Sequence, residues 1–480
     1  MQDRTPFLEA LKQQSKHCHA PFYLPGHKQG KGVSQPFKTW LGNAVFEADL
    51  PELPELDNLF NPEGVIRDAQ RLAAEAFGAS QTWFLANGST AGVVAAILAT
   101  CLIGDKILLP RNVHKSAISG LILSGAKPVF INPEYHTHWN IALSVDLEAL
   151  EAALSQHPDI KVIFLVSPTY HGVCSDLETI ADRCHDRNVI LIVDEAHGAH
   201  FKFHPDFPKS ALECGADLVV QSTHKTLSAL SQASMLHVKG DRIDRTQIDR
   251  ALSLVQSTSP NALLLASLDA ARYQMATEGF ERLQQTLDNA ESARSKLSQL
   301  PNLKLFEQFE NFDRTRITID ATKWGLTGYE ADEILHEQFG VTCELPELQH
   351  LTFAVTLGNT VADIDRLVEG FEQLQNLQQI TRSIPNVSLP PIPSAPMTPR
   401  DAYFTASEAV ALEGSLDRIC TELLCPYPPG IPILIPGERI TSAALAYLQN
   451  ILNAGGLVTG FAETTGKTVR VAKAKSRSIV

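Results

Sequence analysis

The stretch "VILIVDEAHGAH" (residues 189–200) joins a run of five apolar residues to two acidic and two histidine side chains. A short apolar run without polar interruption is typical of a strand that is buried on both faces of a sheet. Further runs of this kind are "TWFLA" (82–86), "KILLP" (106–110), "KPVFIN" (127–132), "VIFLVSP" (162–168), "ADLVVQST" (216–223) and "ASMLHV" (233–238). Stretches with helical periodicity separate them: "IRDAQRLAAEAFG" (66–78), "DLEALEAALSQH" (146–157) and "DLETIADRCHDRN" (176–188). Strands that alternate with helices predict an α/β fold, with a mostly parallel sheet covered by helices on both faces.

The unusual polar clusters of this region all follow predicted strands. They are "NGST" (87–90), "SPTYHG" (167–172), "DEAHGAH" (194–200) and "STHK" (222–225). In parallel sheets, ligands bind beyond the carboxyl ends of the strands. The sequence therefore predicts a ligand site at this edge of the sheet.

The composition narrows the classes of function. Among 480 residues, the net charge of -14 argues against a general nucleic-acid surface, because phosphate binding needs clustered Lys and Arg. The eight cysteines form no CxxC pair, and the N-terminus lacks the apolar core of a secretory signal. Reduced thiols and a cytoplasmic location are therefore expected. Residues 76–104 carry no charge, but the polar "NGST" in their middle favours a buried strand and helix over a membrane span.

Lys225 lies at the mouth of the predicted strand "ADLVV", where desolvating an ammonium group costs free energy. A lysine in this position either pairs with an anion or does covalent chemistry through its uncharged amine, which removes that cost. Pyridoxal 5′-phosphate (PLP) fits this position, because Lys225 would hold its aldehyde and Asp194 would pair with its ring nitrogen.

The phosphate of PLP has predicted partners in two of the same clusters. Gly88, Ser89 and Thr90 begin a predicted helix, whose backbone N–H groups favour an anion. Ser222 and His224 flank the lysine and are predicted to add contacts.

A metal site is the main alternative, since each of these groups alone has a simpler interpretation as a cap or turn. The stretch "DEAHGAHFKFH" (194–204) carries three histidines that would share one face of a helix near two carboxylates: His197, His200, His204, Asp194 and Glu195. A metal would leave Lys225 and "NGST" unexplained. The order of phosphate loop, Asp and Lys along the chain therefore favours PLP, with no metal.

Eight motifs together resemble one known family over nearly the whole chain. They are "PFYLPGHKQGKG" (21–32), "DLPELPELDNLFNPEGVIRDAQRLAAEAFGA" (49–79), "FLANGSTAG" (84–92), "PRNVHKSAISGLILSGA" (110–126), "SPTYHGVCSDL" (167–177), "VDEAHGAHFKFHP" (193–205), "QSTHKTLSALSQASMLH" (221–237) and "YPPGIPILIPGE" (427–438). The chain resembles the Orn/Lys/Arg decarboxylases, fold type I PLP enzymes, in their short form without an additional N-terminal wing domain. The stretch from about 280 to 380 is the least diagnostic.

The resemblance implies the aspartate aminotransferase-like fold and several roles. His114 would stack on the pyridine ring, Thr169 would lie near its phenolic oxygen, and His197 would lie close to the ring. The implied reaction is α-decarboxylation of a basic L-amino acid, after which Lys225 or His224 would protonate the α-carbon. The family also implies a homodimer, or a larger homo-oligomer, with active sites shared between subunits.

The predicted domain boundaries combine the periodicity with the resemblance. Six prolines in "IPNVSLPPIPSAPMTPR" indicate an extended connector, and residues 314–378 alternate strands, including "VTCEL" (341–345), with helices. We expect an N-terminal segment that contributes to the active site and dimer interface (1–60), followed by a large PLP-binding domain (61–300). A small α+β domain (301–383), the connector (384–400) and a C-terminal domain (401–480) complete the chain.

The substrate is the least determined expectation. A distal guanidinium or ammonium group needs a carboxylate, and the candidates are Asp49, Glu52, Asp57, Glu344 and Glu438. Arginine, giving agmatine, ranks first because short-form relatives include arginine decarboxylases; lysine (to cadaverine) and ornithine (to putrescine) follow. An aminotransferase or carbon–sulfur lyase would share the cofactor groups but not the products. A silent binding protein would be expected to lose Lys225 or Asp194, and both are present.

Overall fold

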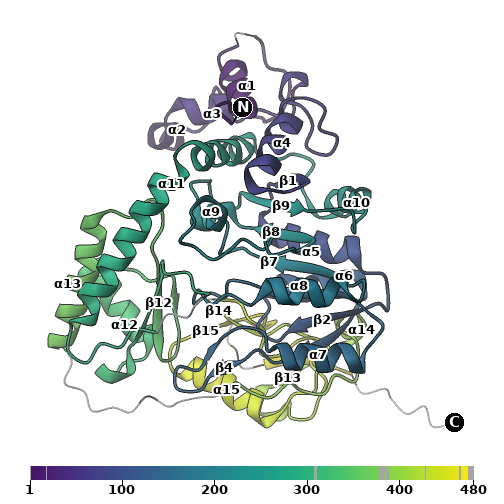
Figure 1. Ribbon diagram of the computed structural model, residues 1–480, viewed down its shortest axis with the longest axis vertical. Coiled ribbons are helices and arrows are strands. Elements are labelled where there is room, and N and C mark those ends of the chain that lie inside the picture. Colours follow the sequence, from purple (N-terminus) through teal and green to yellow (C-terminus); the bar gives the residue numbers. More distant parts are fainter. Residues whose placement is uncertain are drawn as a thin grey trace. The chain divides into compact units, whose positions relative to one another are not determined.

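The computed structural model describes residues 2–17, 19–306, 311–377, 384, 389–427, 429–463, 466 and 468–473. The chain divides into two compact units. Unit 1 comprises Met1–Thr100 and Leu177–Gln285, and unit 2 comprises Cys101–Asp176 and Thr286–Val480. Figure 1 labels their helices and strands along the chain.

Unit 1 is built on four strands in the order β1-β9-β8-β7 (Figure 1). Their bounds are β1 Gln81–Leu85, β7 Ile190–Asp194, β8 Leu218–Gln221 and β9 Ser234–Val238. Strands β7 and β8 are parallel, whereas β9 is antiparallel to both β1 and β8. The helices of this unit are α1 Pro6–Ser15, α2 Gln35–Leu41, α3 Asn43–Ala48, α4 Val65–Phe77, α5 Gly88–Thr100, α8 Leu177–His185, α9 Thr223–Thr226, α10 Arg245–Val255 and the first part of α11 Ala262–Ser298.

Helix α5 packs against the strands of unit 1 at very short range. A Cβ atom added to Gly92 would lie 2.6 Å from Leu85 Cδ1 and 2.9 Å from Val220 Cγ1. A side chain at Gly92 would therefore force Leu85 and Val220 to shift, so glycine allows the helix to lie this close to the sheet. This close approach fixes the position of the N-terminus of α5.

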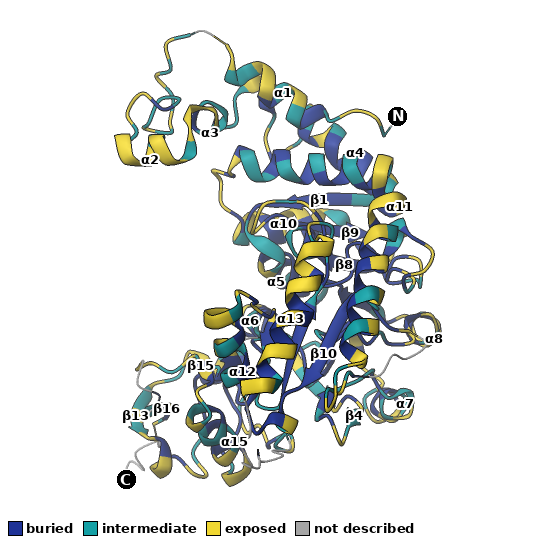
Figure 2. Ribbon diagram, turned by 90° about the vertical axis from the view of Figure 1, so that its left-hand side faces the viewer, coloured by how far each residue is buried: buried dark blue, intermediate teal, exposed yellow. Residues whose placement is uncertain are grey.

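The N-terminal helix α1 is fastened to α11 by buried polar groups. Asp269 Oδ2 accepts a hydrogen bond from the Phe7 N–H, and Arg272 donates to the Gln2 carbonyl oxygen. Arg272 and Asp269 are both fully buried and pair at 2.7 Å. In contrast, α2 has no buried residue and is mostly exposed in Figure 2.

Unit 2 holds a three-stranded parallel set in the order β6-β2-β3 and a three-stranded antiparallel sheet in the order β10-β12-β11. Its strands are β2 Lys106–Pro110, β3 Lys127–Ile131, β4 Tyr135–His136, β5 Ile141–Ala142, β6 Ile160–Val166, β10 Arg316–Asp320, β11 Leu345–Pro346, β12 His350–Ala354, β13 Ser407–Ala411, β14 Cys425–Tyr427, β15 Leu457–Thr459 and β16 Thr468–Ala472. Its helices are α6 Lys115–Ser124, α7 Leu147–Gln156, α12 Gly328–Ile334, α13 Val361–Leu377, α14 Pro399–Tyr403 and α15 Ser442–Asn453.

Two apolar cores lie in the later part of unit 2. One is centred on Ile317, Leu351 and Phe371, which are completely buried, and joins β10 and β12 to α13. The other joins α15 to β16 through Leu448 and Val471, which are also completely buried.

The α/β prediction is confirmed, and one expected strand is mostly absent. Of "VTCEL", only Leu345 lies in a strand, β11. The Cys343 N–H donates to Asp332 Oδ1 instead of to a neighbouring strand. The strand therefore begins only at Leu345. The uncharged segment 76–104 divides into the end of α4, β1 and α5, as expected. Among the described residues, no helix has both the length and the apolar character that crossing a membrane requires.

Candidate active site

Lys225 lies in the short helix α9, just beyond the carboxyl end of β8. Its Nζ atom is 2.9 Å from His197 Nε2, which is hydrogen-bond distance. His197 follows β7 and is only 3% exposed, so its ring holds the amine from a fixed position. The contact places His197 beside Lys225, whereas its predicted position close to the pyridine ring of PLP stays a prediction.

Asp194 ends β7 and is 5% exposed. Burial raises the pKa of its carboxyl group to about 6, although the positive charge of Lys225 and the Ala196 N–H lower it. The carboxylate is therefore incompletely compensated by the groups around it. A protonated ring nitrogen would supply the missing positive charge.

The start of α5 forms a compact cluster with the start of α9. Ser222 Oγ donates to Ser89 Oγ at 2.8 Å, so residues 133 positions apart meet at this helix N-terminus. Thr90 is exposed one residue further into α5, whereas His224 Nδ1 is 2.9 Å from the Ala233 carbonyl oxygen. Backbone N–H groups and two hydroxyls at a helix N-terminus suit a phosphate. Unit 1 thus combines a primary amine, a buried carboxylate with too little positive charge around it, and a helix N-terminus that suits an anion. These three groups fit the aldehyde, the ring nitrogen and the phosphate of PLP.

Gly88 begins α5 with a φ of 76°, a conformation that L side chains rarely adopt. We expect Gly88→Ala to reduce the free energy of unfolding by about 1–2 kcal/mol through backbone strain. Crowding does not contribute, because an added Cβ would lie 3.8 Å from its nearest neighbour, the Gln232 carbonyl oxygen. Urea unfolding measures the effect, with Gly414→Ala as the control in open space. Equal losses in the two variants would contradict the assigned strain.

The histidines of the metal alternative do not share a helix face. Residues 201–203 form a single 3-10 turn, preceded by turns. His197 contacts Lys225, whereas His204 Nε2 is 3.2 Å from Gln284 Oε1. Glu195 accepts hydrogen bonds from the Ala211 N–H and Gln221 Nε2, and burial raises its pKa to about 8. The helical cluster predicted for the metal alternative was therefore wrong.

His114 and Thr169 belong to unit 2. His114 caps α6, with its Nδ1 atom accepting from the Ser116 N–H at 3.2 Å. Thr169 is 4% exposed, and its Oγ1 accepts from the Val173 N–H. Their predicted positions beside the cofactor remain predictions.

The five predicted substrate carboxylates lie in different settings. Glu438 is 1% exposed, pairs with Arg111 at 3.0 Å and accepts from the Ile435 N–H. Asp49 is 3.0 Å from His27 Nε2, and Glu52 accepts from Asn58 and the Leu59 N–H. Glu344 is exposed, and its side chain lines a cavity beside α13.

Asp57 serves the backbone at the start of α4. Its carboxylate accepts hydrogen bonds from the N–H groups of residues 58, 63, 64, 66 and 67. Burial raises the pKa of Asp57, but these donors outweigh burial and lower it overall. Asp57 uses both carboxylate oxygens on backbone donors, and Glu438 is almost completely buried in an ion pair with a permanently charged arginine, which weakens both as ligands of a substrate cation.

Sequence reasoning missed a second polar cluster, in unit 2. Glu347 Oε2 is 2.8 Å from His171 Nε2 and 3.0 Å from His350 Nδ1. His171 lies in "SPTYHG", a strand-end cluster, so its position was a usable signal. Glu347 and His350 come from the least diagnostic stretch, and only the hairpin between β11 and β12 brings them to His171.

Comparisons with known proteins agree over nearly the whole chain. The family description "Orn/Lys/Arg decarboxylase, major domain" matches residues 5–337, and the corresponding C-terminal domain matches residues 383–479. The arginine decarboxylases of Halalkalibacterium halodurans and Bacillus subtilis are each 38% identical over 482 residues, covering 98% of this chain and 98% of the relative. The structure of the Francisella novicida lysine decarboxylase has a TM-score of 0.84 at 22% identity, covering 98% of this chain and 81% of that chain.

Proposed function

Because the chain belongs to the Orn/Lys/Arg decarboxylase family, we propose that it converts L-arginine to agmatine and carbon dioxide with PLP as cofactor. The family comprises PLP-dependent amino acid decarboxylases, so the chain is an enzyme of this class. The single observation that carries the proposal is Lys225 at hydrogen-bond distance from His197, in the same unit as the buried Asp194. Arginine is preferred over lysine because two relatives that are 38% identical over 98% of this chain are named arginine decarboxylases, whereas the lysine decarboxylase of Hafnia alvei, which covers 95% of this chain, is 24% identical.

When bound, PLP would supply an aldehyde that condenses with amines and a ring that accepts the electron pair released with carbon dioxide. Lys225 would hold the cofactor covalently until the substrate amine replaces it. His197 is placed to exchange a proton with Lys225 Nζ, which would leave the lysine amine neutral and able to react. Asp194 would stabilise the positive charge on the ring nitrogen.

The remaining residues of unit 1 would orient the cofactor and return the proton. Ser89, Ser222 and the N-terminus of α5 would bind the phosphate, and Thr90 and Gly88 would complete the loop around it. After carbon dioxide leaves, Lys225 or His224 would protonate the α-carbon. From unit 2, His114 and Thr169 would contact the ring, as the family resemblance implies.

We propose that the enzyme is a cytoplasmic homodimer, or a larger homo-oligomer, with shared active sites. The "PFYLPGHK" motif and α2 present large apolar side chains to solvent in the single chain: Phe22 is 94%, Leu24 73% and Trp40 78% exposed. Such a concentration of exposed apolar groups favours an interface with another chain.

Substrate preference tests the proposal. We expect kcat/KM for carbon dioxide release to be at least about tenfold higher with L-arginine than with L-lysine or L-ornithine, a difference of about 1.4 kcal/mol in transition-state binding. The measurement uses PLP-loaded wild-type protein and the three amino acids at matched pH. A higher value with lysine would overturn the arginine assignment in favour of lysine decarboxylation.

A further inference from the structure

A small cavity of about 80 Å³ in unit 2 combines one carboxylate with several aromatic side chains. Its wall includes Glu347, Tyr135, Tyr170, Tyr329 and Tyr447. The tyrosines come from separate parts of unit 2, namely β4, the segment after β6, α12 and α15. A single water needs roughly 10–15 Å³ of such space, so a small organic group can be accommodated.

Glu347 is held as an anion at this wall. Its Oε2 atom contacts both His171 and His350, and its side chain is 26% exposed. Burial raises the pKa of Glu347, but His171 and His350 lower it well below its usual range. Both contacts use Oε2, which leaves Oε1 for a further partner among the groups that enter the cavity.

His350 is one of the two histidines that contact Glu347 and orient its carboxylate. Its Nδ1 faces Glu347, and its Nε2 lies 2.6 Å from the Trp139 carbonyl oxygen, which can only accept. Burial lowers the pKa of His350, but Glu347 and the Trp139 carbonyl raise it overall. The two contacts fix the imidazole ring, and with it the orientation of the Glu347 carboxylate.

The tyrosines complete an environment suited to an organic cation. Burial raises the pKa of Tyr135, Tyr329 and Tyr447, and the negative charge of Glu347 also raises each of them. They therefore remain neutral phenols at physiological pH. Aromatic faces around a carboxylate bind guanidinium and ammonium groups through cation–π and ionic contacts.

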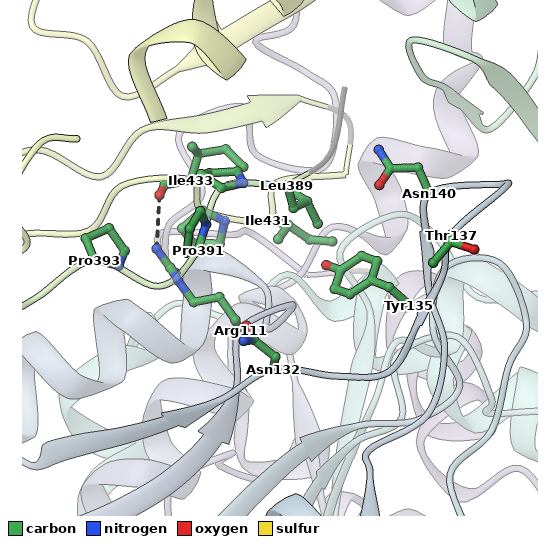
Figure 3. A pocket seen from close by; sticks show the side chains of 12 residues that line it. Arg111, Asn132, Tyr135, Thr137, Asn140, Leu389, Pro391, Pro393, Ile431 and Ile433 are labelled. Atoms are coloured by element: carbon green, nitrogen blue, oxygen red, sulfur yellow. Dashed lines mark hydrogen bonds between the residues drawn. The ribbon is translucent and has the colours of Figure 1, made fainter. Parts of the chain in front are cut away.

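A larger neighbouring cavity has a volume of about 320 Å³ (Figure 3). Among the described residues that line it, none carries a carboxylate. It shares Tyr135, Asn140, Ile431 and Ile433 with the smaller cavity. Its charged side chain is Arg111, whose guanidinium donates to the Ile433 carbonyl oxygen, as Figure 3 shows. Arg111 already pairs with Glu438 and is itself a cation, so it offers a second cation no acceptor, and the smaller cavity is the better cation site.

We propose that the cavity at Glu347 binds the distal guanidinium or ammonium group of the basic amino acid, or the same group on its amine product. The inference rests on the proposed function for the identity of the cation. Thr169, which the family resemblance predicts to lie beside the cofactor, lines the same cavity, so a substrate that reaches Glu347 would extend away from Thr169. This assignment adds Glu347 to the five carboxylates considered from the sequence and prefers it to Glu344.

The same three side chains also satisfy the distance requirement for a divalent metal, since their ligand atoms lie within 4.8 Å of one another. The hydrogen-bonding pattern favours the organic cation. In the arrangement seen, His350 Nδ1 faces Glu347 Oε2 at 3.0 Å, so a metal ion would first have to break this contact, whereas an organic cation would leave it in place.

The test compares arginine with citrulline, its uncharged analogue, in Glu347→Gln and wild-type holoenzyme. We expect the ratio of kcat/KM for arginine to kcat/KM for citrulline to fall at least about 30-fold in Glu347→Gln, because the counter-ion is lost. Glu347→Asp keeps the charge and should keep most of the preference, which a purely structural role would not explain. Glu372→Gln, on the exposed face of α13, is the matched control and should leave the ratio unchanged.

A second measurement is calorimetric binding of agmatine to the wild type and Glu347→Gln. Loss of the arginine preference supports binding of the substrate's distal group, whereas weaker agmatine binding with an unchanged ratio supports binding of the free product. The proposal is overturned if neither quantity changes, if Glu344→Gln alone removes the preference, or if a chelator abolishes activity and a divalent metal restores it. If the wild type releases no carbon dioxide from any basic amino acid, the proposed function fails, and agmatine binding still tests the cavity.

Discussion

Lys225→Ala is expected to lower kcat for carbon dioxide release from arginine by at least about 1,000-fold. The variant loses both the amine that would hold PLP and a candidate proton donor, whereas His197 and Asp194 remain. Titration with PLP should give the wild type the visible absorption band of lysine-bound cofactor. The variant should not gain that band.

Lys202→Ala provides the matched control for this experiment. Lys202 belongs to the same unit but pairs with Glu213 at the surface, at 2.6 Å. It should gain the absorption band and keep wild-type kcat. Wild-type activity in Lys225→Ala would mean that another lysine binds the cofactor.

Asp194→Asn is expected to lower kcat by about 100- to 1,000-fold, because the ring nitrogen would lose its anionic partner. The neutral amide cannot stabilise a positive ring nitrogen to the same extent. Steady-state kinetics at saturating PLP separates this loss from weaker cofactor binding. Unchanged kcat would contradict the role assigned to Asp194.

The same substitution should stabilise the cofactor-free protein. The pKa of Asp194 is raised to about 6 in the folded state, from a usual value of 3.8, so the folded state binds more protons between these values. Stability therefore falls as pH rises from about 4 to about 6, by about 3 kcal/mol. Asp194→Asn removes this loss, and urea unfolding without PLP at pH 5 and pH 8 should show a larger gain at pH 8. Equal gains at both pH values would contradict the raised pKa.

Much of unit 1 could be predicted from the sequence because its signals are local. Continuous apolar runs identified β1, β7, β8 and β9, and Gly78 ends α4 in the left-handed conformation expected of a helix C-cap. The strand-end rule then located Lys225, Asp194 and Ser89 without any knowledge of their contacts. Ser89 and Ser222 do meet, because both follow strands of the same sheet.

The polar cluster of unit 2 could not be predicted, since it depends on pairing between distant segments. His171 and Glu347 are 176 residues apart and meet only through the hairpin of β11 and β12. The prediction of a strand over "VTCEL" was wrong for a related reason. The side chain of Asp332 in α12 accepts the hydrogen bond of the Cys343 N–H, which therefore does not pair with a neighbouring strand. Likewise, the spacing of His197, His200 and His204 is helical, but the backbone there is not. Sequence spacing alone does not determine such tertiary contacts.

The most direct test of the proposed chemistry follows the carboxyl carbon of the substrate. PLP-loaded wild-type protein is incubated with L-arginine that carries ¹³C in its carboxyl group, and the gas and the solution are analysed by mass spectrometry. We predict one labelled carbon dioxide for each agmatine formed, with no 2-oxo acid. A labelled 2-oxo acid that retains the carboxyl carbon, without carbon dioxide, would contradict decarboxylation and identify an aminotransferase.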